Sequence, residues 1–185
     1  MNFNKHYNLA GKHSFLSASQ YHWINYDNEK LVERYRTWRA AQRGTILHDT
    51  AATLINLGIK LPKSKKTFNQ YVNDCIGFKM TPEQPLYYSE NAFGTADAIS
   101  FKKNKLKIFD LKTGNSGDIK QLYVYAAYFC LEYDHAPGEI EIELRLYKNN
   151  EVIIEEPEAD VILPIMDKII TFDKLIDQLR LEEEV

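Results

Sequence analysis

Two aspartates close together in the sequence have the types and spacing needed to bind a metal ion. Asp97 lies in the segment Gly-Thr-Ala-Asp-Ala, and Asp110 follows in the segment Ile-Phe-Asp-Leu-Lys. If two strands joined by a tight turn lie between them, the carboxylates come to lie side by side. Oxygen ligands that converge at one end of a sheet are those that Mg²⁺ or Mn²⁺ prefers. The pair therefore predicts a site for one of these ions.

A lysine follows the second aspartate at the spacing of one pleat. In an extended strand Asp110 and Lys112 share one face, together with Leu106 and Ile108. A lysine there could hold a metal-bound water and stabilise negative charge on a phosphate. A lysine buried beside two acids is also typical of a purely structural ion triad, and Asp-x-Lys alone is a weak motif. Both readings stay open at this point.

Three further side chains strengthen the catalytic interpretation when they are taken together. Gln121 and Tyr125 are four residues apart in a predicted helix and therefore project from one side of it. His48, five residues after Arg43, would add an imidazole ligand from an upstream helix. Each of these residues taken singly is more typical of packing or of a surface. Their joint order with Asp97 and the Asp-x-Lys motif is much harder to obtain by chance.

The elements that must position these side chains are helical at first. The pattern predicts a helix over 31–57, with a break around Arg43 and Gly44, and a second helix over 67–78. Two prolines soon after residue 78 end the helical region.

Strands follow and then alternate with helices. We expect strands over 86–90, 94–101, 106–112, 139–147 and 151–155, with helices over 118–131 and 158–182. In the fourth strand, alternation predicts inward side chains at Ile140, Ile142, Leu144 and Leu146, and outward ones at Glu139, Glu141, Glu143 and Arg145. The order predicts an α/β or α+β fold. We interpret residues 1–185 as one domain, with a helical basic part over 1–80, a catalytic sheet over 81–155 and the C-terminal amphipathic helix.

Composition and cysteine content exclude several classes of protein. The chain has 185 residues, 44% of them hydrophobic and 26% charged, which is a globular composition and argues against disorder. Cys75 and Cys130 cannot supply four ligands for an iron–sulfur cluster or a zinc ribbon. Residues 1–11 lack the apolar segment of a signal peptide, and no apolar run is long enough to span a bilayer. A soluble, cytoplasmic protein is expected.

Charge is distributed unevenly along the chain. Residues 1–80 contain 12 Lys and Arg against 5 Asp and Glu, whereas residues 132–185 contain 5 against 16. A basic front and an acidic tail are compatible with local binding of a polyanion. An acidic solvated face explains the tail equally well.

The order of these motifs resembles the PD-(D/E)XK nuclease superfamily. Within it, the chain is most similar to the RecB-like branch, which includes the lambda-type (YqaJ) exonucleases, and to its small phage-type members. The resemblance covers about residues 13–128. It is carried by the segments 94–98 and 121–126, by Asp110 and Lys112, and by a Leu-Ser-x-Ser-like opening before Trp23.

The resemblance implies a restriction-endonuclease-like core, in which a central mixed sheet is flanked by helices, and assigns roles to residues. His48, Asp97, Asp110 and the carbonyl of Leu111 would bind Mg²⁺ or Mn²⁺, and Lys112 would be the catalytic lysine. Gln121 and Tyr125 would support the site and the DNA backbone. Where many relatives have Glu before the lysine, this chain has Asp110. Neither an iron–sulfur cluster nor a nucleotide cofactor is expected.

Several residues outside these motifs are further candidates. Glu90, seven residues before Asp97, is a possible outer metal ligand. Candidate contacts to DNA phosphates are Arg39, Arg43, Lys63, Lys65 and Lys66, with Ser17 and Ser19 of the opening segment. Nothing in the sequence is typical of a major-groove recognition helix, so we expect contact with the DNA backbone or strand ends and little sequence preference.

The sequence as a whole therefore predicts a divalent-metal-dependent DNA nuclease. Foremost is an exonuclease in phage or bacterial recombination or repair, acting in the cytoplasm of a bacterial cell or a phage-infected host. An endonuclease or nickase of the same fold is an alternative. A non-catalytic module that binds nucleic acid or protein is another. A homo-oligomer or a protein partner is compatible with the sequence, and a membrane partner is not expected.

Overall fold

A computed structural model describes residues 4–9, 11–114 and 117–183 of the chain. Its internal contacts divide the chain into two compact units, Met1–Thr45 and Ile46–Val185, and each is described by itself. The interpretation of residues 1–185 as one nuclease domain stays a prediction.

The first unit is helical and contains most of a long helix. Short 3₁₀ helices span Tyr7–Leu9 and Ala18–Asn25, and α1 spans Asn28–Leu57, with its residues from Ile46 onward in the second unit. Asp27 caps α1 by accepting a hydrogen bond from the backbone N–H of Lys30 at 2.8 Å. The predicted break around Arg43 and Gly44 is wrong, because α1 runs through both residues. A single glycine costs a helix only about 1 kcal/mol relative to alanine, which a long helix tolerates.

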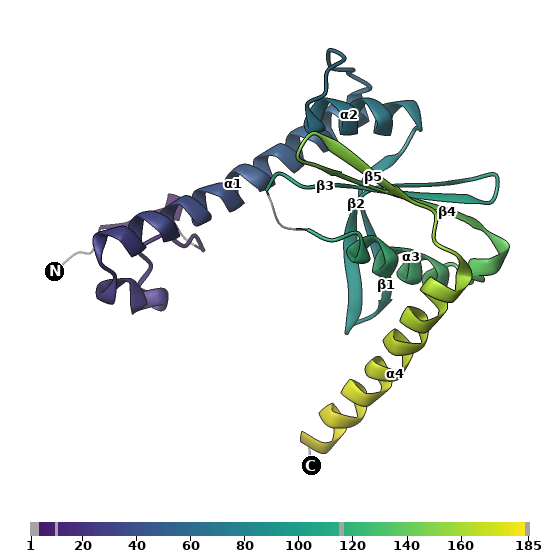
Figure 1. The fold of residues 1–185 in the computed structure, drawn as a ribbon. Helices are drawn as coiled ribbons and strands as arrows, with labels where there is room; N and C mark the ends of the chain where they lie inside the picture. Colours follow the sequence, from purple (N-terminus) through teal and green to yellow (C-terminus); the bar gives the residue numbers. More distant parts are fainter. Residues whose placement is uncertain (1–3, 10, 115–116, 184–185) are drawn as a thin grey trace. The chain divides into compact units, whose positions relative to one another are not determined.

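The second unit contains a mixed five-stranded sheet whose strands lie in sequence order (Figure 1). Neighbouring strands are antiparallel except for β3 and β4, which are parallel because α3 connects them. The strands are β1 (Thr81–Ser89), β2 (Ala92–Lys102), β3 (Lys105–Leu111), β4 (Glu141–Lys148) and β5 (Glu151–Glu155). The protein is therefore an α/β protein with a central mixed sheet flanked by helices, as the sequence predicted.

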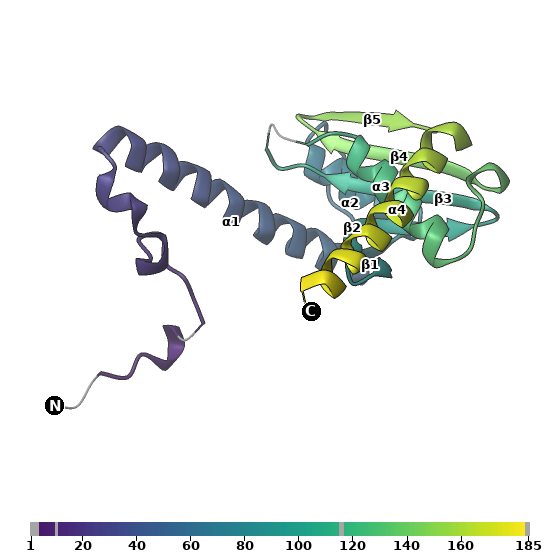
Figure 2. The ribbon, with the colours of Figure 1, turned by 90° about the horizontal axis from the view of Figure 1, so that it is seen from below.

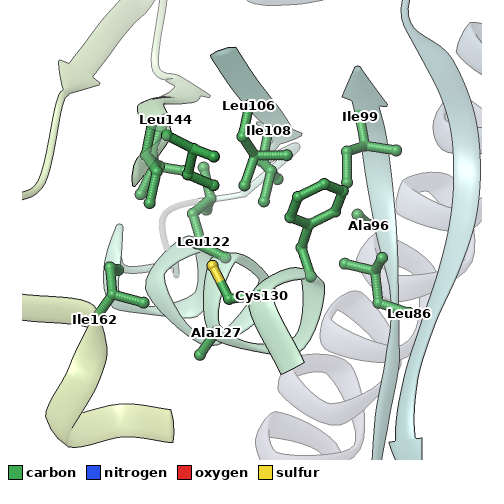
Figure 3. Close-up of a cluster of buried hydrophobic side chains, with 14 of the residues drawn as sticks. Leu86, Ala96, Ile99, Leu106, Ile108, Leu122, Ala127, Cys130, Leu144 and Ile162 are labelled. Carbon is green, nitrogen blue, oxygen red and sulfur yellow. The ribbon is translucent and has the colours of Figure 1, made fainter. Parts of the chain in front are cut away.

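Helices cover both faces of the sheet (Figure 2). On one face, α3 (Lys120–Glu132) and α4 (Ala159–Glu183) enclose a core that includes Leu106 and Ile108 (Figure 3). On the other face, α2 (Thr67–Gly77) and the end of α1 enclose a second core that includes Phe109 and Leu111. Strand β3 thus sends alternate side chains into two cores, so its whole length is held in place from both sides.

The predicted outward face of the fourth strand is wrong in part. Glu143 is buried, and Arg145 is half-buried with its guanidinium 4.8 Å from the ring of Phe78. The physical reason is that α2 and the residues after it cover this face of the sheet. Glu139 lies before the strand, in the 3₁₀ turn Pro137–Glu139.

The first strand also begins earlier than the pattern predicted. β1 starts at Thr81 and contains both Pro82 and Pro85. An edge strand accepts proline, because one row of its N–H groups has no partner strand. The helices at 67–78, 118–131 and 158–182 and the hairpin around Asn149 are confirmed to within two residues. In the described part of the chain, no helix is both long enough and apolar enough to cross a bilayer.

Candidate functional site

Asp97 and Asp110 lie where the hairpin of β2 and β3 stops pairing. The register of the hairpin runs from Lys102 opposite Lys105 to Ala98 opposite Phe109. Beyond that last pair, Oδ2 of Asp97 accepts a hydrogen bond from the backbone N–H of Leu111 at 2.8 Å. The side-chain carboxylate of Asp97 thus accepts the hydrogen bond that a backbone carbonyl of β2 would accept in a continued β2–β3 pairing. The link fixes Asp97 beside the strand that carries Asp110.

His48 reaches Asp97 from α1. Its Nδ1 lies 3.3 Å from Oδ2 of Asp97. Ala51 and Ile55, three and seven residues later in the helix, are buried in the second core, so they anchor the helix face that carries His48. The hydrogen bond with Asp97 raises the pKa of the His48 imidazole above its usual 6.5, against the lowering effect of burial. The imidazole and the carboxylate therefore interact directly.

Glu83 joins this pair and was missed by the sequence analysis. One ligand atom each of His48, Glu83 and Asp97 lies within 4.8 Å of the other two. Glu83 stands between the partners of Ala98 and Ala96, which places it opposite Asp97 in the pairing of β1 with β2. Its φ of 50° is left-handed, which is uncommon for a residue with a side chain and often marks a functional position.

Glu90, the outer ligand that the sequence suggested, lies elsewhere. It is in the turn between β1 and β2, where its Oε1 accepts a hydrogen bond from the hydroxyl of Tyr87 at 3.2 Å. Seven residues of strand separate it from Glu83, which corresponds to roughly 20 Å. The strand start at Thr81 explains the error, because the predicted strand 86–90 left Glu83 outside the sheet.

Asp110 is the most deeply buried charged group of the site. Its exposed fraction is 1%. Nζ of Lys112 donates to its Oδ1 at 3.1 Å and lies 3.0 Å from its Oδ2, but in the described residues no donor makes a well-directed hydrogen bond to Oδ2. Burial, followed by the charge of Asp97, raises the pKa of Asp110 to about 6. The structure therefore holds a buried carboxylate whose Oδ2 has the Lys112 ammonium 3.0 Å away but, in the described residues, no well-directed hydrogen bond.

A chain of hydrogen bonds holds the lysine from the other side. Nζ of Lys112 donates to Oε1 of Gln121 at 2.8 Å, and Nε2 of Gln121 donates to the hydroxyl of Tyr125 at 3.1 Å. The first turns of α3 therefore position the ammonium group, and the expected role of Gln121 and Tyr125 toward the DNA backbone stays a prediction.

Two glycines make room for this arrangement. A Cβ on Gly94 would lie 3.0 Å from the ring of Tyr125. A Cβ on Gly117 would lie 2.7 Å from Cγ of Lys112, and the φ of +119° at this residue also requires glycine. A larger residue at position 94 would displace Tyr125, and one at position 117 would displace Lys112 itself.

The donor set fits a hard divalent cation. Asp97 and Glu83 offer carboxylate oxygens close to the imidazole nitrogen of His48. Asp110 is not part of this group, but it is near enough for the charge of Asp97 to raise its pKa. Carboxylate oxygens suit Mg²⁺ and Mn²⁺, and an added imidazole nitrogen favours Mn²⁺ over the harder Mg²⁺. The buried Oδ2 of Asp110, which lacks a well-directed hydrogen bond in the described residues, is available as a further oxygen ligand. Leu111, whose carbonyl is a further candidate, is the last residue of β3 between Asp110 and Lys112.

The basic candidates divide between the two units. Lys66 lines a cleft of about 280 Å³ that Lys112 and Thr113 also line. Lys63 and Lys65 are exposed in the preceding loop, outside that lining. Four candidates belong to the Met1–Thr45 unit: Ser17, Ser19, Arg39 and Arg43. Among these, the hydroxyls of Ser17 and Ser19 lie 2.8 Å apart.

No protein-family model matches the sequence, and no curated protein matches it. The fold and the cluster of His48, Glu83, Asp97, Asp110 and Lys112 are therefore the grounds for any statement about function.

Proposed function

We propose that the protein is a divalent-metal-dependent DNA nuclease of the PD-(D/E)XK type, foremost an exonuclease. One observation carries the proposal. A buried aspartate whose Oδ2 lacks a hydrogen bond in the described residues lies beside a lysine that is held on both sides, by Asp110 and by Gln121. A purely structural ion pair would have no need of an unsatisfied buried oxygen, because such an atom is costly.

The metal ligands in this proposal are Asp97, Asp110 and His48, with the carbonyl of Leu111 and the carboxylate of Glu83 nearby. A bound Mg²⁺ or Mn²⁺ would supply a nucleophilic water at neutral pH and neutralise charge on the phosphate. Because Asp97 is already linked to His48 and to the N–H of Leu111, its carboxylate is oriented before any ion arrives. Little reorganisation is then needed on binding.

Lys112 would stabilise the charge that develops on the phosphate. Its Nζ keeps hydrogen bonds to Asp110 and Gln121 on the protein side, which directs the remaining donor capacity of the ammonium toward a substrate oxygen. Tyr125 orients Gln121, and Gly94 leaves space for the ring of Tyr125. These residues are positioning residues, whereas Lys112 would touch the reacting group.

The cleft beside Lys112 supports a polymeric substrate. It is lined by Lys66, Thr113 and Asn149 among others, so cationic and neutral polar groups continue outward from the lysine. A phosphodiester backbone that passes through this cleft would present one phosphate to Lys112 and leave a neighbouring one near Lys66. A small metabolite would not require such a continuation.

A cleavage assay tests the proposal. End-labelled linear DNA and closed circular DNA, each single- and double-stranded, are incubated with Mg²⁺, Mn²⁺ or EDTA, and the Asp110→Ala protein is treated in parallel. The expected result is metal-dependent loss of linear DNA that the variant lacks. Cutting of circular DNA would identify an endonuclease or nickase of the same chemistry. DNA binding that is equal with and without EDTA, with no cutting, would contradict the proposal and favour a non-catalytic module.

A further inference from the structure

An open aromatic cleft lies within the Met1–Thr45 unit, and no residue of the candidate metal site lines it. It has a volume of about 540 Å³, and its walls include Phe15, Trp23, Tyr26 and Trp38, with Arg34 and His22 as polar side chains. This size is within the range of small-molecule sites. The nuclease chemistry proposed above makes no use of it.

The aromatic walls are held in defined positions. Nε1 of Trp23 donates to the carbonyl of Ser17 at 2.9 Å. The rings of Phe15 and Trp38 have centroids 5.6 Å apart, and Tyr35 stacks on Trp38 with an interplanar angle of 29°. Rings that are fixed in advance lose little entropy when a flat ligand stacks on them.

This cluster is not a closed core. None of the residues 4–8 and 11–45 is buried, and Phe15, Trp23, Tyr26 and Trp38 are only half-buried. Aromatic faces of this size normally gain stability by complete burial. Here they leave one side of the cleft open to a ligand.

Charge indicates which kind of ligand fits. Residues 1–45 contain 7 Lys and Arg against 3 Asp and Glu, whereas the chain as a whole has a net charge of −3. Arg34 lines the cleft itself, and Nζ of Lys30 lies 4.9 Å from the centroid of the Tyr26 ring. A ligand with flat aromatic rings on an anionic backbone complements both properties.

We propose that this cleft binds unpaired bases of single-stranded DNA by stacking them on Trp23 and Trp38, with Arg34 contacting a backbone phosphate. The inference rests on the proposed nuclease function and names its substrate class, a strand with an unpaired segment. Bases in a duplex have their faces covered by their neighbours, so a duplex cannot use the cleft without fraying. Aromatic platforms in a basic groove bind single strands with little sequence preference.

Tryptophan emission gives a direct test, because Trp23 and Trp38 are the two tryptophans of the chain and both line the cleft. The full-length protein is titrated in EDTA with oligo-dT and, separately, with a blunt duplex of equal length. Stacking should quench the emission with oligo-dT at concentrations where the duplex leaves it unchanged. No cleavage is required for this signal.

Variants assign the signal to the cleft. Trp38→Ala should weaken oligo-dT binding roughly tenfold or more, and Trp38→Phe should restore most of it because the phenyl ring still stacks. Arg34→Gln, a change at an exposed side chain, should weaken binding and reduce the salt dependence by roughly 0.7 in log–log slope for the one lost phosphate contact. Tyr7→Ala is the matched control, since Tyr7 is an exposed aromatic of the same unit outside the cleft. Its affinity should equal that of the parent protein.

The outcomes separate this inference from the proposed function. Quenching by oligo-dT without cutting under any metal condition would support the cleft and contradict the nuclease. Metal-dependent cutting without quenching would support the nuclease and overturn the cleft. Equal quenching by oligo-dT and duplex, or unchanged affinity in both Trp38→Ala and Arg34→Gln, would also overturn it. A third result would also overturn it: oligo-dT causes no quenching, the parent protein is a dimer, and Trp38→Ala makes it a monomer. The cleft would then bind a second copy of the chain.

Discussion

Two buried carboxylates on neighbouring strands of one sheet are treated in opposite ways. Glu143 on β4 accepts hydrogen bonds from Lys107 and from Nε of Arg145, and Lys105 lies 3.2 Å from its Oε2. Asp110 on β3 has one lysine, and its Oδ2 has no hydrogen bond in the described residues. Burial tends to raise the pKa of Glu143, but the bonds from Lys107 and Arg145 bring it below its usual value. Burial dominates at Asp110, whose pKa rises to about 6.

The contrast distinguishes a structural ion cluster from a candidate binding site. Each oxygen of Glu143 has cationic partners, so this carboxylate stabilises the fold as it stands. Asp110 pays a desolvation cost that the protein alone does not offset. An uncompensated cost of this kind is expected where the functional state of the site includes a further positive charge.

Replacing Lys112 should lower the cleavage rate far more than replacing Lys107. Lys112→Met should lower the cleavage rate roughly 10²- to 10³-fold, because the charge on the phosphate loses its stabilising ammonium. Lys107→Met removes a lysine from the Glu143 cluster and should leave the rate per folded molecule nearly unchanged. Initial rates on linear DNA at saturating metal measure both. Equal losses in the two variants would show that the lysines act through stability and not through catalysis.

The next effect concerns stability. Glu143→Gln should lower the free energy of unfolding by roughly 2–3 kcal/mol, since Lys107 would lose its carboxylate partner at low exposure and Arg145 would keep only Asp74. Urea unfolding in EDTA at neutral pH measures it. Glu141→Gln is a matched control, because Glu141 is an exposed glutamate of the same strand. An unchanged free energy of unfolding in Glu143→Gln would mean that the ion cluster makes no net contribution to stability.

Metal affinity can show whether Glu83 or Glu90 contributes to the metal site. Glu83→Gln should weaken Mn²⁺ binding roughly tenfold, because it removes an anionic group close to His48 and Asp97. Glu90→Gln should leave the affinity unchanged. Isothermal titration with Mn²⁺, without DNA, measures both. The opposite pattern would restore Glu90 as the outer ligand.

The smallest effect has the opposite sign to that of Glu143. Asp110→Asn should raise the free energy of unfolding by roughly 1 kcal/mol at pH 7 in EDTA, while it abolishes metal-dependent cleavage. The folded state binds the proton of Asp110 more tightly than the unfolded state does, because its pKa is about 6 instead of 3.8. Stability from this group is therefore present at low pH and is lost as the pH rises through about 6.

Urea unfolding at several pH values checks this sign. The stability difference between Asp110→Asn and the parent protein should be small near pH ~4 and should grow until the pH passes about 6. A difference that is constant with pH, or that favours the parent protein at pH 7, would contradict the idea that Asp110 is held at a cost.

Much of the fold follows from local pattern, and so do the Asp-x-Lys and Gln-x-x-x-Tyr parts of the site. Leu106 and Ile108 alternate with Phe109 and Leu111, so the strand that carries Asp110 is recognisable without any tertiary information. Lys112 is found by the same parity. Gln121 reaches it because α3 starts soon after the strand ends.

The features that the sequence did not predict depend on strand pairing and on contacts between distant segments. Glu83 becomes a site residue only through its place opposite Asp97, and the two prolines beside it hid the strand that carries it. Glu143 was expected to face solvent because alternation says which side chains share a face but not what covers that face. The cover comes from α2, some seventy residues earlier in the chain.

Gly117 has a consequence for finding similar proteins. The stem of Lys112 occupies the space that a Cβ at position 117 would fill. A pattern of Asp-x-Lys followed after four residues by Gly therefore encodes a steric requirement of the lysine and is more selective than Asp-x-Lys alone. Chains that match the longer pattern downstream of Gly-x-x-Asp would be the first to compare with this one, even where overall sequence identity is too low to align.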